Sequence, residues 1–232
     1  MLTPDDHLVA VVAHPDDAEM MAYGTLRRAR QLGAAVTVVV ATTGINGVSL
    51  ADRDRGRQLT GEHRAAESTA SYTDTGITVV CLGLTDGALT ADRELISLVE
   101  AELVRLRCTV LLTHTRHGAN DHQDHLAVAQ AAANAATRVG TCATILHGEP
   151  HAPRTDFHPT VLVDVTEWID DKVKALQAHQ SQAGRWYLGE EYTRHRAAAA
   201  GWRLAPLHAA AGRCFEAFET TLITLFGAEA TA

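Results

Sequence analysis

Short apolar runs alternate with longer amphipathic stretches along this chain of 232 residues. The apolar runs are rich in valine, leucine and alanine, which is typical of buried strands. They lie at residues 8–13, 35–42, 77–82, 109–113, 143–146, 160–165 and 214–226. In the stretches between them, apolar residues recur at helical spacing or good helix formers dominate. These predicted helices are residues 19–32, 57–71, 93–107, 125–137 and 167–180.

Strands that alternate with helices indicate an α/β fold, with a Rossmann-like, mostly parallel sheet and helices on both of its faces. At 232 residues the chain is long enough for one large domain. It contains no internal repeat, low-complexity segment or clear linker, so a single domain over residues 1–232 is predicted. Within it, residues 1–149 are expected to form the sheet core, and residues 150–232 to extend the same domain and decorate the sheet.

A polar cluster follows the first apolar run at once, in the stretch Ala13-His14-Pro15-Asp16-Asp17-Ala18-Glu19. Pro15 fixes its own φ and biases His14 toward an extended conformation, so this turn is stiff. Ligands of open α/β sheets bind at the carboxyl ends of strands, where one imidazole and two carboxylates suit a metal site. The alternative is that Asp16 or Asp17 caps the next helix and that His14 is an incidental loop residue.

A second cluster, much later in the chain, favours the functional interpretation. The stretch His122-Gln123-Asp124-His125 also follows a predicted strand, residues 109–113, and precedes an alanine-rich helical pattern. Two strand-end loops that each carry histidine and aspartate converge if their strands lie near each other in one sheet. The sequence therefore predicts a metal site built from both loops.

Together these residues resemble the zinc-dependent N-acetylglucosaminyl deacetylase family, of LmbE or PIG-L type. The first family motif is matched by His14, Pro15, Asp16, Asp17 and Glu19, and the second by His122, Asp124 and His125. Weaker similarities cover most of the chain, at Gly24-Thr25-Leu26, Arg64-Ala65-Ala66-Glu67, residues 172–182 and Phe215-Glu216-Ala217-Phe218. The two main motifs in this order, each after a strand, are specific for the family, whereas the weaker similarities alone are not.

The resemblance implies one Zn²⁺ per chain, held by His14, Asp17 and His125. Two imidazoles and one carboxylate form a reasonable ligand set for a catalytic zinc, which keeps an open position for water. The same resemblance assigns Asp16 as the general base for that water, whose pKa zinc lowers to about 7. His122 would then stabilise the oxyanion as an imidazolium or protonate the departing amine.

Residues around these motifs are candidates for supporting roles. Asp124 is expected to orient one of the histidines, as carboxylates behind metal ligands do. Tyr23 precedes Gly24 where the family pattern often has a second glycine, so its phenol is a candidate for substrate contact. Asn120 stands where some members place a tyrosine as an oxyanion partner, and an amide can also donate a hydrogen bond.

Arg64 and a group of aromatic residues each have two possible interpretations. Arg64 either contacts substrate or forms a salt bridge with Glu67 on its helix. The aromatic residues Trp186, Tyr187 and Tyr192 either pack in the core or form a platform for a sugar ring.

The composition argues against several classes of protein. Because 20 Lys and Arg residues stand against 28 Asp and Glu, the net charge is −8, and without a basic cluster nucleic acid is not an expected partner. No apolar run approaches the ~20 residues of a membrane span, and the amino-terminal residues lack a signal-peptide pattern, so a cytoplasmic location is expected. The four cysteines are widely spaced and are predicted to be mostly buried free thiols. A homo-oligomer is compatible with this sequence.

Three functions remain open at this stage. The first is a zinc deacetylase that removes an acyl group, expected to be acetyl, from an N-acetylated amino sugar, glycoconjugate or natural-product intermediate. The second is a zinc amidase on a non-sugar N-acyl substrate, with the same metal motifs and different substrate loops. The third is a non-catalytic sugar- or nucleotide-binding α/β module. The sequence contains neither H-E-x-x-H nor the H-x-E and P-C-x-x-C pair, which disfavours a metalloprotease or a base deaminase.

Overall fold

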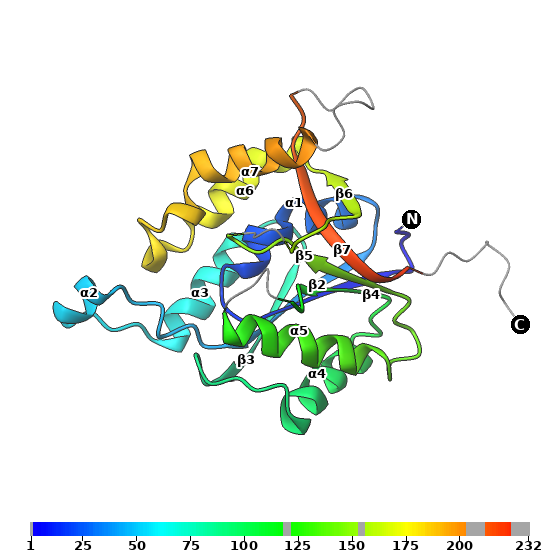
Figure 1. Ribbon diagram of the computed structural model, residues 1–232, viewed down its shortest axis with the longest axis horizontal. Helices are drawn as coiled ribbons and strands as arrows, with labels where there is room; N and C mark the ends of the chain where they lie inside the picture. Colours follow the sequence, from blue (N-terminus) through cyan, green and yellow to red (C-terminus); the bar gives the residue numbers. More distant parts are fainter. Residues whose placement is uncertain (1, 118–121, 153–155, 203–211, 224–232) are drawn as a thin grey trace, which may run out of the picture.

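One seven-stranded sheet organises the computed structural model, which describes residues 2–117, 122–152, 156–202 and 212–223 (Figure 1). Its strands are β1 (His7–Val12), β2 (Ala35–Thr42), β3 (Thr78–Leu84), β4 (Val110–His114), β5 (Thr144–Gly148), β6 (Val161–Asp164) and β7 (Phe215–Ile223). They lie in the order β3-β2-β1-β4-β5-β7-β6. The pairs from β3 to β5 are parallel, whereas β7 is antiparallel to both β5 and β6. The prediction of an α/β fold with a mostly parallel sheet is therefore confirmed.

Helices cover both faces of this sheet. They are α1 (Asp17–Gln31), α2 (Leu50–Asp54), α3 (Gly61–Ser71), α4 (Arg93–Arg105), α5 (Gln123–Ala136), α6 (Ile169–Gln177) and α7 (Glu190–Trp202). Side chains of β1 alternate between two cores: Leu8 and Ala10 pack with α1 and α6, and Val9 and Val11 pack with α4 and α5. The uninterrupted apolar run of β1 follows from this position, because a central parallel strand is buried on both faces.

Three helical segments differ from the sequence-based expectation, and the first is the short helix α2, which was not predicted. Residues 57–60 are not helical, because α3 begins at Gly61 after Thr60, whose hydroxyl accepts a hydrogen bond from His63 N at 3.2 Å. Helix α7 was not predicted, since its acidic first turn and its run of alanines carry no continuous apolar stripe.

The C-terminal part of the chain completes the sheet rather than only decorating it. Strand β7 lies between β5 and β6, so the last described strand separates two strands that precede it in sequence (Figure 1). This insertion depends on pairing between segments far apart in the chain, which local patterns do not encode. The division at residues 149 and 150 stays a prediction.

The cysteines differ in burial. Cys108 is buried as expected, Cys142 and Cys214 are half-buried, and Cys81 is exposed because β3 lies at the edge of the sheet. All four are free thiols. Among the described residues, no helix has the length and apolar character needed to cross a membrane.

Candidate metal and catalytic site

The two polar motifs meet because their strands are neighbours. Strand β1 pairs in parallel with β4, so the loops after both strands emerge at the same edge of the sheet. His14 Nδ1 lies 3.1 Å from His125 Nε2 and 3.3 Å from Asp17 Oδ2. His125 Nε2 lies 3.2 Å from Asp17 Oδ1. These three side chains form a compact triangle of potential ligand atoms.

The dimensions of this triangle fit a metal ion. A tetrahedral zinc with bonds of about 2.0–2.1 Å holds its ligand atoms roughly 3.3 Å apart. The shortest contacts between the three side chains, at 3.1, 3.2 and 3.3 Å, are close to that separation, with Asp17 facing His14 through Oδ2 and His125 through Oδ1. His14, Asp17 and His125 could therefore hold one divalent cation. Among the described residues, three other groups bring three ligand atoms within 4.8 Å of one another: Asp17-His114-His125, His14-His122-His125 and His14-Asp86-Asp124.

The second nitrogen of His14 is held by carboxylates. Nε2 lies 3.1 Å from Asp124 Oδ2 and 3.2 Å from Asp86 Oδ1. Asp124 is itself held in place, since its two oxygens accept hydrogen bonds from the backbone N–H groups of Gly87 and Leu89. An imidazole that faces a metal with one nitrogen and a carboxylate with the other is the usual arrangement behind a metal ligand.

The charges around His14 suit a cation. Burial by itself lowers the pKa of His14, but hydrogen bonds to Asp124, Asp17 and Asp86 outweigh it and raise the pKa to about 12. The protonated, positively charged His14 imidazole is thus surrounded by three carboxylates. Because a metal ligand must be a neutral imidazole, a bound cation would take the place of this proton.

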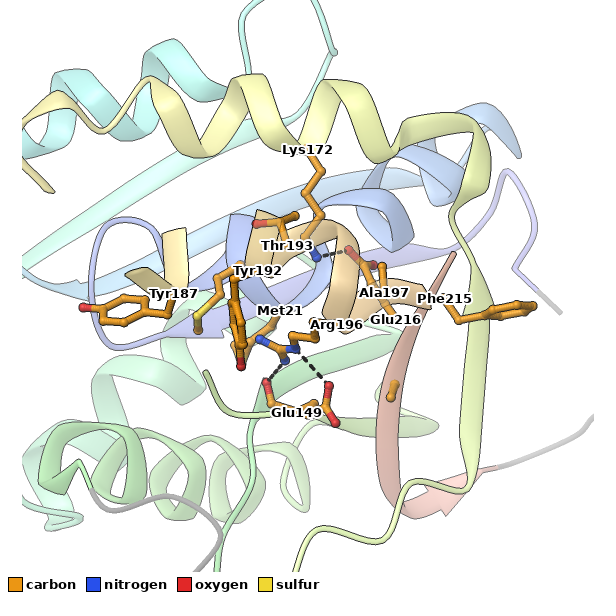
Figure 2. Close-up of a pocket in the computed structure, with 12 residues that line it drawn as sticks. Met21, Glu149, Lys172, Tyr187, Tyr192, Thr193, Arg196, Ala197, Phe215 and Glu216 are labelled. Carbon is orange, nitrogen blue, oxygen red and sulfur yellow. Dashed lines mark hydrogen bonds and ion pairs between the residues drawn. The ribbon is translucent and has the colours of Figure 1, made fainter. Parts of the chain in front are cut away.

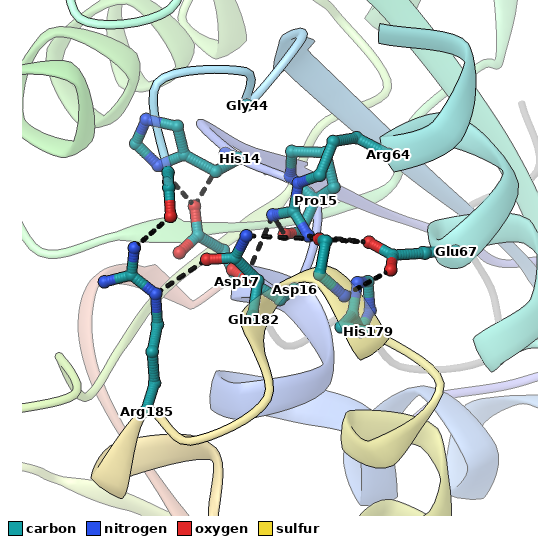
Figure 3. Close-up of polar contacts among 12 residues, drawn as sticks. His14, Pro15, Asp16, Asp17, Gly44, Arg64, Glu67, His179, Gln182 and Arg185 are labelled. Atoms are coloured by element: carbon teal, nitrogen blue, oxygen red, sulfur yellow. Dashed lines mark hydrogen bonds and ion pairs between the residues drawn. The ribbon is translucent and has the colours of Figure 1, made fainter. Parts of the chain in front are cut away.

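Asp16 lies beside the triangle and is held by Arg64 (Figure 3). Arg64 Nη2 donates to Asp16 Oδ2 at 3.1 Å and also to the carbonyl oxygen of Pro15. Asp16 precedes α1 with a φ of 112°, and its side chain does not cap that helix. Burial raises the pKa of Asp16, while Arg64 opposes that rise. The carboxylate is therefore oriented by Arg64 and not by the helix end.

The turn between His14 and Asp17 is packed tightly against the next loop. A Cβ atom on Gly44, whose φ is +64°, would lie 2.7 Å from Pro15 Cδ and 3.1 Å from Arg64 Nε. Only glycine fits this position without displacing the Pro15-Asp16 turn.

Arg64 has a positioning role here in addition to lining the cavity. Its Nη1 donates to Glu67 Oε2 at 3.0 Å and to Ser181 Oγ at 3.1 Å, and the side chain is buried. A second set of contacts surrounds Glu19 on α1. Glu19 Oε1 accepts a hydrogen bond from the Ser71 hydroxyl and lies 3.0 Å from His179 Nε2. The weakly matching segments of the sequence therefore meet behind the first motif.

A second buried network, around Lys172 and Glu216, holds α1 against α6 and β7 (Figure 2). Glu216 on β7 pairs with Lys172 Nζ at 2.7 Å and accepts from the backbone N–H groups of Gly24 and Thr25 at 3.0 and 2.7 Å. Burial lowers the pKa of Lys172, and Glu216 partly opposes this. The pair fixes α6 and β7 to the middle of the helix that carries Asp17.

The Lys172–Glu216 pair gives a stability prediction. We expect Lys172→Met to lower the free energy of unfolding by about 3–5 kcal/mol, because it leaves the Glu216 carboxylate buried without its cation. Urea denaturation followed by circular dichroism measures the change. Lys174→Met, on the exposed side of the same helix, is the matched control and should change stability by no more than about 0.5 kcal/mol. Equal effects of the two substitutions would contradict this structural role.

His122 stands at the start of α5, and its side-chain Nδ1 accepts from Asp124 N at 3.2 Å. The proton of a neutral ring is then assigned to Nε2. Burial, followed by the nearby His125 and His14, lowers the pKa of His122. These surroundings favour a neutral N–H donor over the imidazolium that the sequence led us to expect.

One predicted substrate contact, Tyr23, is not brought into this site. Tyr23 is buried in the core, where it stacks on Tyr72 at 5.7 Å and its hydroxyl accepts from Arg27 at 3.2 Å. The helix α1 turns it away from the cavity that His14 lines. Asn120 lies outside the described residues.

Two residues near the triangle carried no local sequence signal. His114 ends β4, stacks on His125 with ring centroids 4.1 Å apart and lies 3.4 Å from Asp17 Oδ2. Its Nε2 accepts from Ala13 N at 3.0 Å, so this lone pair already has a partner. Asp86 was interpreted only as part of a turn. His114 ends β4 and Asp86 follows β3, so both lie at the same carboxyl edge, and this placement is the signal that could have found them.

A cavity of about 420 Å³ opens over the triangle. Its lining combines the motif residues His14, Asp16, Asp17, His122 and His125 with Asn46, Asp86, Gln123, His151, Arg185 and Tyr187. This volume lies within the range of small-molecule sites. Most of the residues that line it are polar or charged.

Comparisons with known proteins agree with this geometry. The family described as PIG-L, GlcNAc-PI de-N-acetylase, matches residues 9–136, which is more than half of the chain. The uncharacterized deacetylase YaiS of Escherichia coli K12 is 30% identical over 180 residues, which cover 75% of this chain and 90% of that protein.

Solved structures show the same fold. N,N'-diacetylchitobiose deacetylase from Pyrococcus horikoshii aligns with a TM-score of 0.78 at 20% identity, covering 94% of this chain and 84% of that one. The 4-carboxy-2-hydroxymuconate hydratase GalB from Pseudomonas putida also has a TM-score of 0.78, at 22% identity, covering 97% and 100%. Since both a deacetylase and a hydratase have this fold, the reaction must be argued from the site and the sequence family. On the evidence of both motifs and the matching family, this chain belongs to the PIG-L family of GlcNAc-PI de-N-acetylases and is a hydrolytic N-deacetylase.

Proposed function

We propose that the chain is a zinc-dependent hydrolase that removes the acetyl group from the amide nitrogen of an N-acetylated amino sugar in a small glycoconjugate. The triangle of His14, Asp17 and His125, with Asp16 beside it, is the observation that carries the proposal. The family description, which names a GlcNAc-containing substrate, supports the sugar.

The protein groups have complementary roles in this proposal. His14, Asp17 and His125 would hold the zinc, which supplies activation of a water molecule and polarisation of the amide carbonyl. Asp16, oriented by Arg64, accepts the proton that the attacking water loses. His122 donates a hydrogen bond from its Nε2–H to the acyl oxygen, where negative charge develops, and the protonated Asp16 passes its proton to the departing nitrogen. Asp124 keeps His14 in the orientation that ligation requires.

The other two functions make different demands on these residues. A zinc amidase on a non-sugar substrate needs the same triangle, and only its substrate differs. A non-catalytic binding module needs neither the Asp16–Arg64 contact nor a donor at His122. The arrangement of both beside one ligand triangle therefore favours a hydrolase.

A paired measurement tests the proposed function. Purified protein is analysed for metals, stripped with a chelator and reloaded with zinc, and acetate release is followed from N-acetylglucosamine, N,N'-diacetylchitobiose and several N-acetyl amino acids. We expect activity that returns with zinc and is confined to the sugars. Activity on the amino acids alone would support the amidase, and no metal with no hydrolysis would support the binding module.

The substitution Asp124→Asn tests whether the Asp124 carboxylate orients His14 for metal binding. We expect the affinity for zinc, or the activity, to fall about 10–100-fold, because the carboxylate that orients the imidazole is lost. The site should still fill when zinc is in excess. Competition titrations against a chelator measure the affinity, with Asp5→Asn at the exposed amino-terminal end as control. An unchanged affinity and an unchanged rate would contradict this role of Asp124.

A further inference from the structure

A line of aromatic rings leads from the ligand triangle to the protein surface. His151 stands perpendicular to His125 with ring centroids 6.3 Å apart, and Tyr187 follows His151 at 4.7 Å. Trp186 lies 5.6 Å from Tyr187 and 4.8 Å from Tyr192. His151 and Tyr187 line the cavity, whereas Trp186 lies beyond them with 60% of its surface exposed. We call His151, Tyr187 and Trp186 the aromatic wall.

Hydrogen bonds hold the aromatic wall in place. Arg185 Nη1 donates to the Tyr187 hydroxyl at 3.1 Å. Its Nε donates to Gln182 Oε1 at 2.7 Å (Figure 3). The Tyr192 hydroxyl donates to the carbonyl oxygen of His151. These bonds hold the Tyr187 hydroxyl and the His151 backbone, and Trp186 has ring contacts with Tyr187 and Tyr192. A ligand that stacks on the wall therefore meets rings whose positions are already constrained.

The ring of His151 has unused hydrogen-bonding capacity. Within the described part of the chain, no group forms a hydrogen bond with either of its ring nitrogens, although the side chain borders the cavity. Such a group beside a ligand site is available to a substrate. Amide and carboxylate side chains of Asn46, Asp86 and Gln123 also line the cavity.

This combination matches the two kinds of surface on a sugar. A hexose ring presents C–H groups on its faces and hydroxyl groups around its edge. Aromatic rings offer a large, rigid apolar surface for the former, and the amide, carboxylate and imidazole groups suit the latter. An exposed tryptophan next to the cavity supplies a second ring-sized surface further from the triangle.

We propose that the aromatic wall binds a substrate of two linked hexose rings, with the N-acetylated ring against His151 and Tyr187 and the next ring against Trp186. This inference rests on the proposed function and names the residues that select its substrate. It also assigns the aromatic cluster, which the sequence left open between core packing and a sugar platform, to substrate binding.

Steady-state kinetics on one-ring and two-ring substrates test the wall. The probes are N-acetylglucosamine and N,N'-diacetylchitobiose, and the variants of zinc-loaded protein are Trp186→Ala and Tyr187→Ala. We expect Trp186→Ala to raise KM about tenfold for the disaccharide only, with kcat unchanged, since a lost aromatic contact of this kind costs about that much. Tyr187→Ala should raise KM for both sugars. Trp202→Ala, which removes a tryptophan that is 70% exposed on α7, is the matched control and should change neither.

Calorimetric titration of N,N'-diacetylchitobiose into the Asp16→Asn variant measures binding without fast turnover. The expected result is a Kd that weakens about tenfold when Trp186→Ala is added. If the protein hydrolyses the sugars but Trp186→Ala and Tyr187→Ala change neither KM nor Kd, the role of the aromatic wall is overturned and the proposed function stands. Sugar binding that depends on Trp186, without any hydrolysis by the parent protein, would support the wall and overturn the proposed function. If the parent protein neither binds nor hydrolyses these sugars, both the wall and the proposed function are overturned.

Discussion

Asp16→Asn should lower kcat about 10²–10⁴-fold while the zinc content stays at the parent's level. The substitution keeps the size and shape of the side chain and removes its basicity, and general base catalysis contributes about this factor. The amide can still accept a hydrogen bond from Arg64 Nη2, which lies 3.1 Å from the carboxylate, so the turn should keep its conformation. Acetate release from N-acetylated sugars and elemental analysis of the same sample measure the two quantities.

Controls separate this role of Asp16 from two others. Asp5→Asn changes an exposed aspartate near the amino terminus and should leave kcat and zinc content unchanged. A variant that loses its zinc would make Asp16 a metal ligand. One that keeps both zinc and full kcat would remove the support for proton transfer by this carboxylate.

Removal of either His125 or Asp17 should empty the metal site. In His125→Ala and Asp17→Ala we expect the zinc content to fall from one ion per chain toward zero, and activity to fall to the background rate. Each substitution deletes one corner of the triangle, and two remaining ligands do not make a stable zinc site. Metal analysis after dialysis against a weak chelator, and acetate release from the same samples, measure both effects.

Matched variants distinguish this triangle from the two alternative groups that contain His125. His122→Ala should keep its zinc and lose activity, because we place His122 against the substrate and not on the metal. His114→Ala should also retain zinc, since its Nε2 already accepts from Ala13 N. Loss of metal in His122→Ala would indicate the group His14-His122-His125 instead, and loss in His114→Ala the group Asp17-His114-His125.

Much of the core could be predicted from local sequence patterns. The apolar run of β1 and the two histidine–aspartate clusters are each contained in a few consecutive residues, so their character does not depend on distant contacts. Their convergence followed from a general property of parallel sheets, in which the carboxyl ends of neighbouring strands share one edge. The pairing of β1 with β4 confirms it.

Other parts of the site depended on contacts between distant segments. The role of Arg64 depends on its approach to Pro15 and Asp16, which in turn requires a glycine at position 44. Tyr23 was a reasonable candidate by its position in sequence, but the helical rotation from Asp17 directs it into the core. The pKa of His122 is lowered by burial and by His125 and His14, and both its burial and the approach of His14 depend on segments far from it in the sequence.

The sequence by itself determined the class of fold, the order of most strands and helices, and the two motifs that supply the ligand triangle, because these are properties of short segments. The tertiary structure decided where β7 enters the sheet, that Asp86 and His114 stand beside His14 and Asp17, and that the rings from His151 to Trp186 form one wall. These arrangements join residues that lie far apart in the chain, and only the packing of whole elements against one another brings such residues within contact distance.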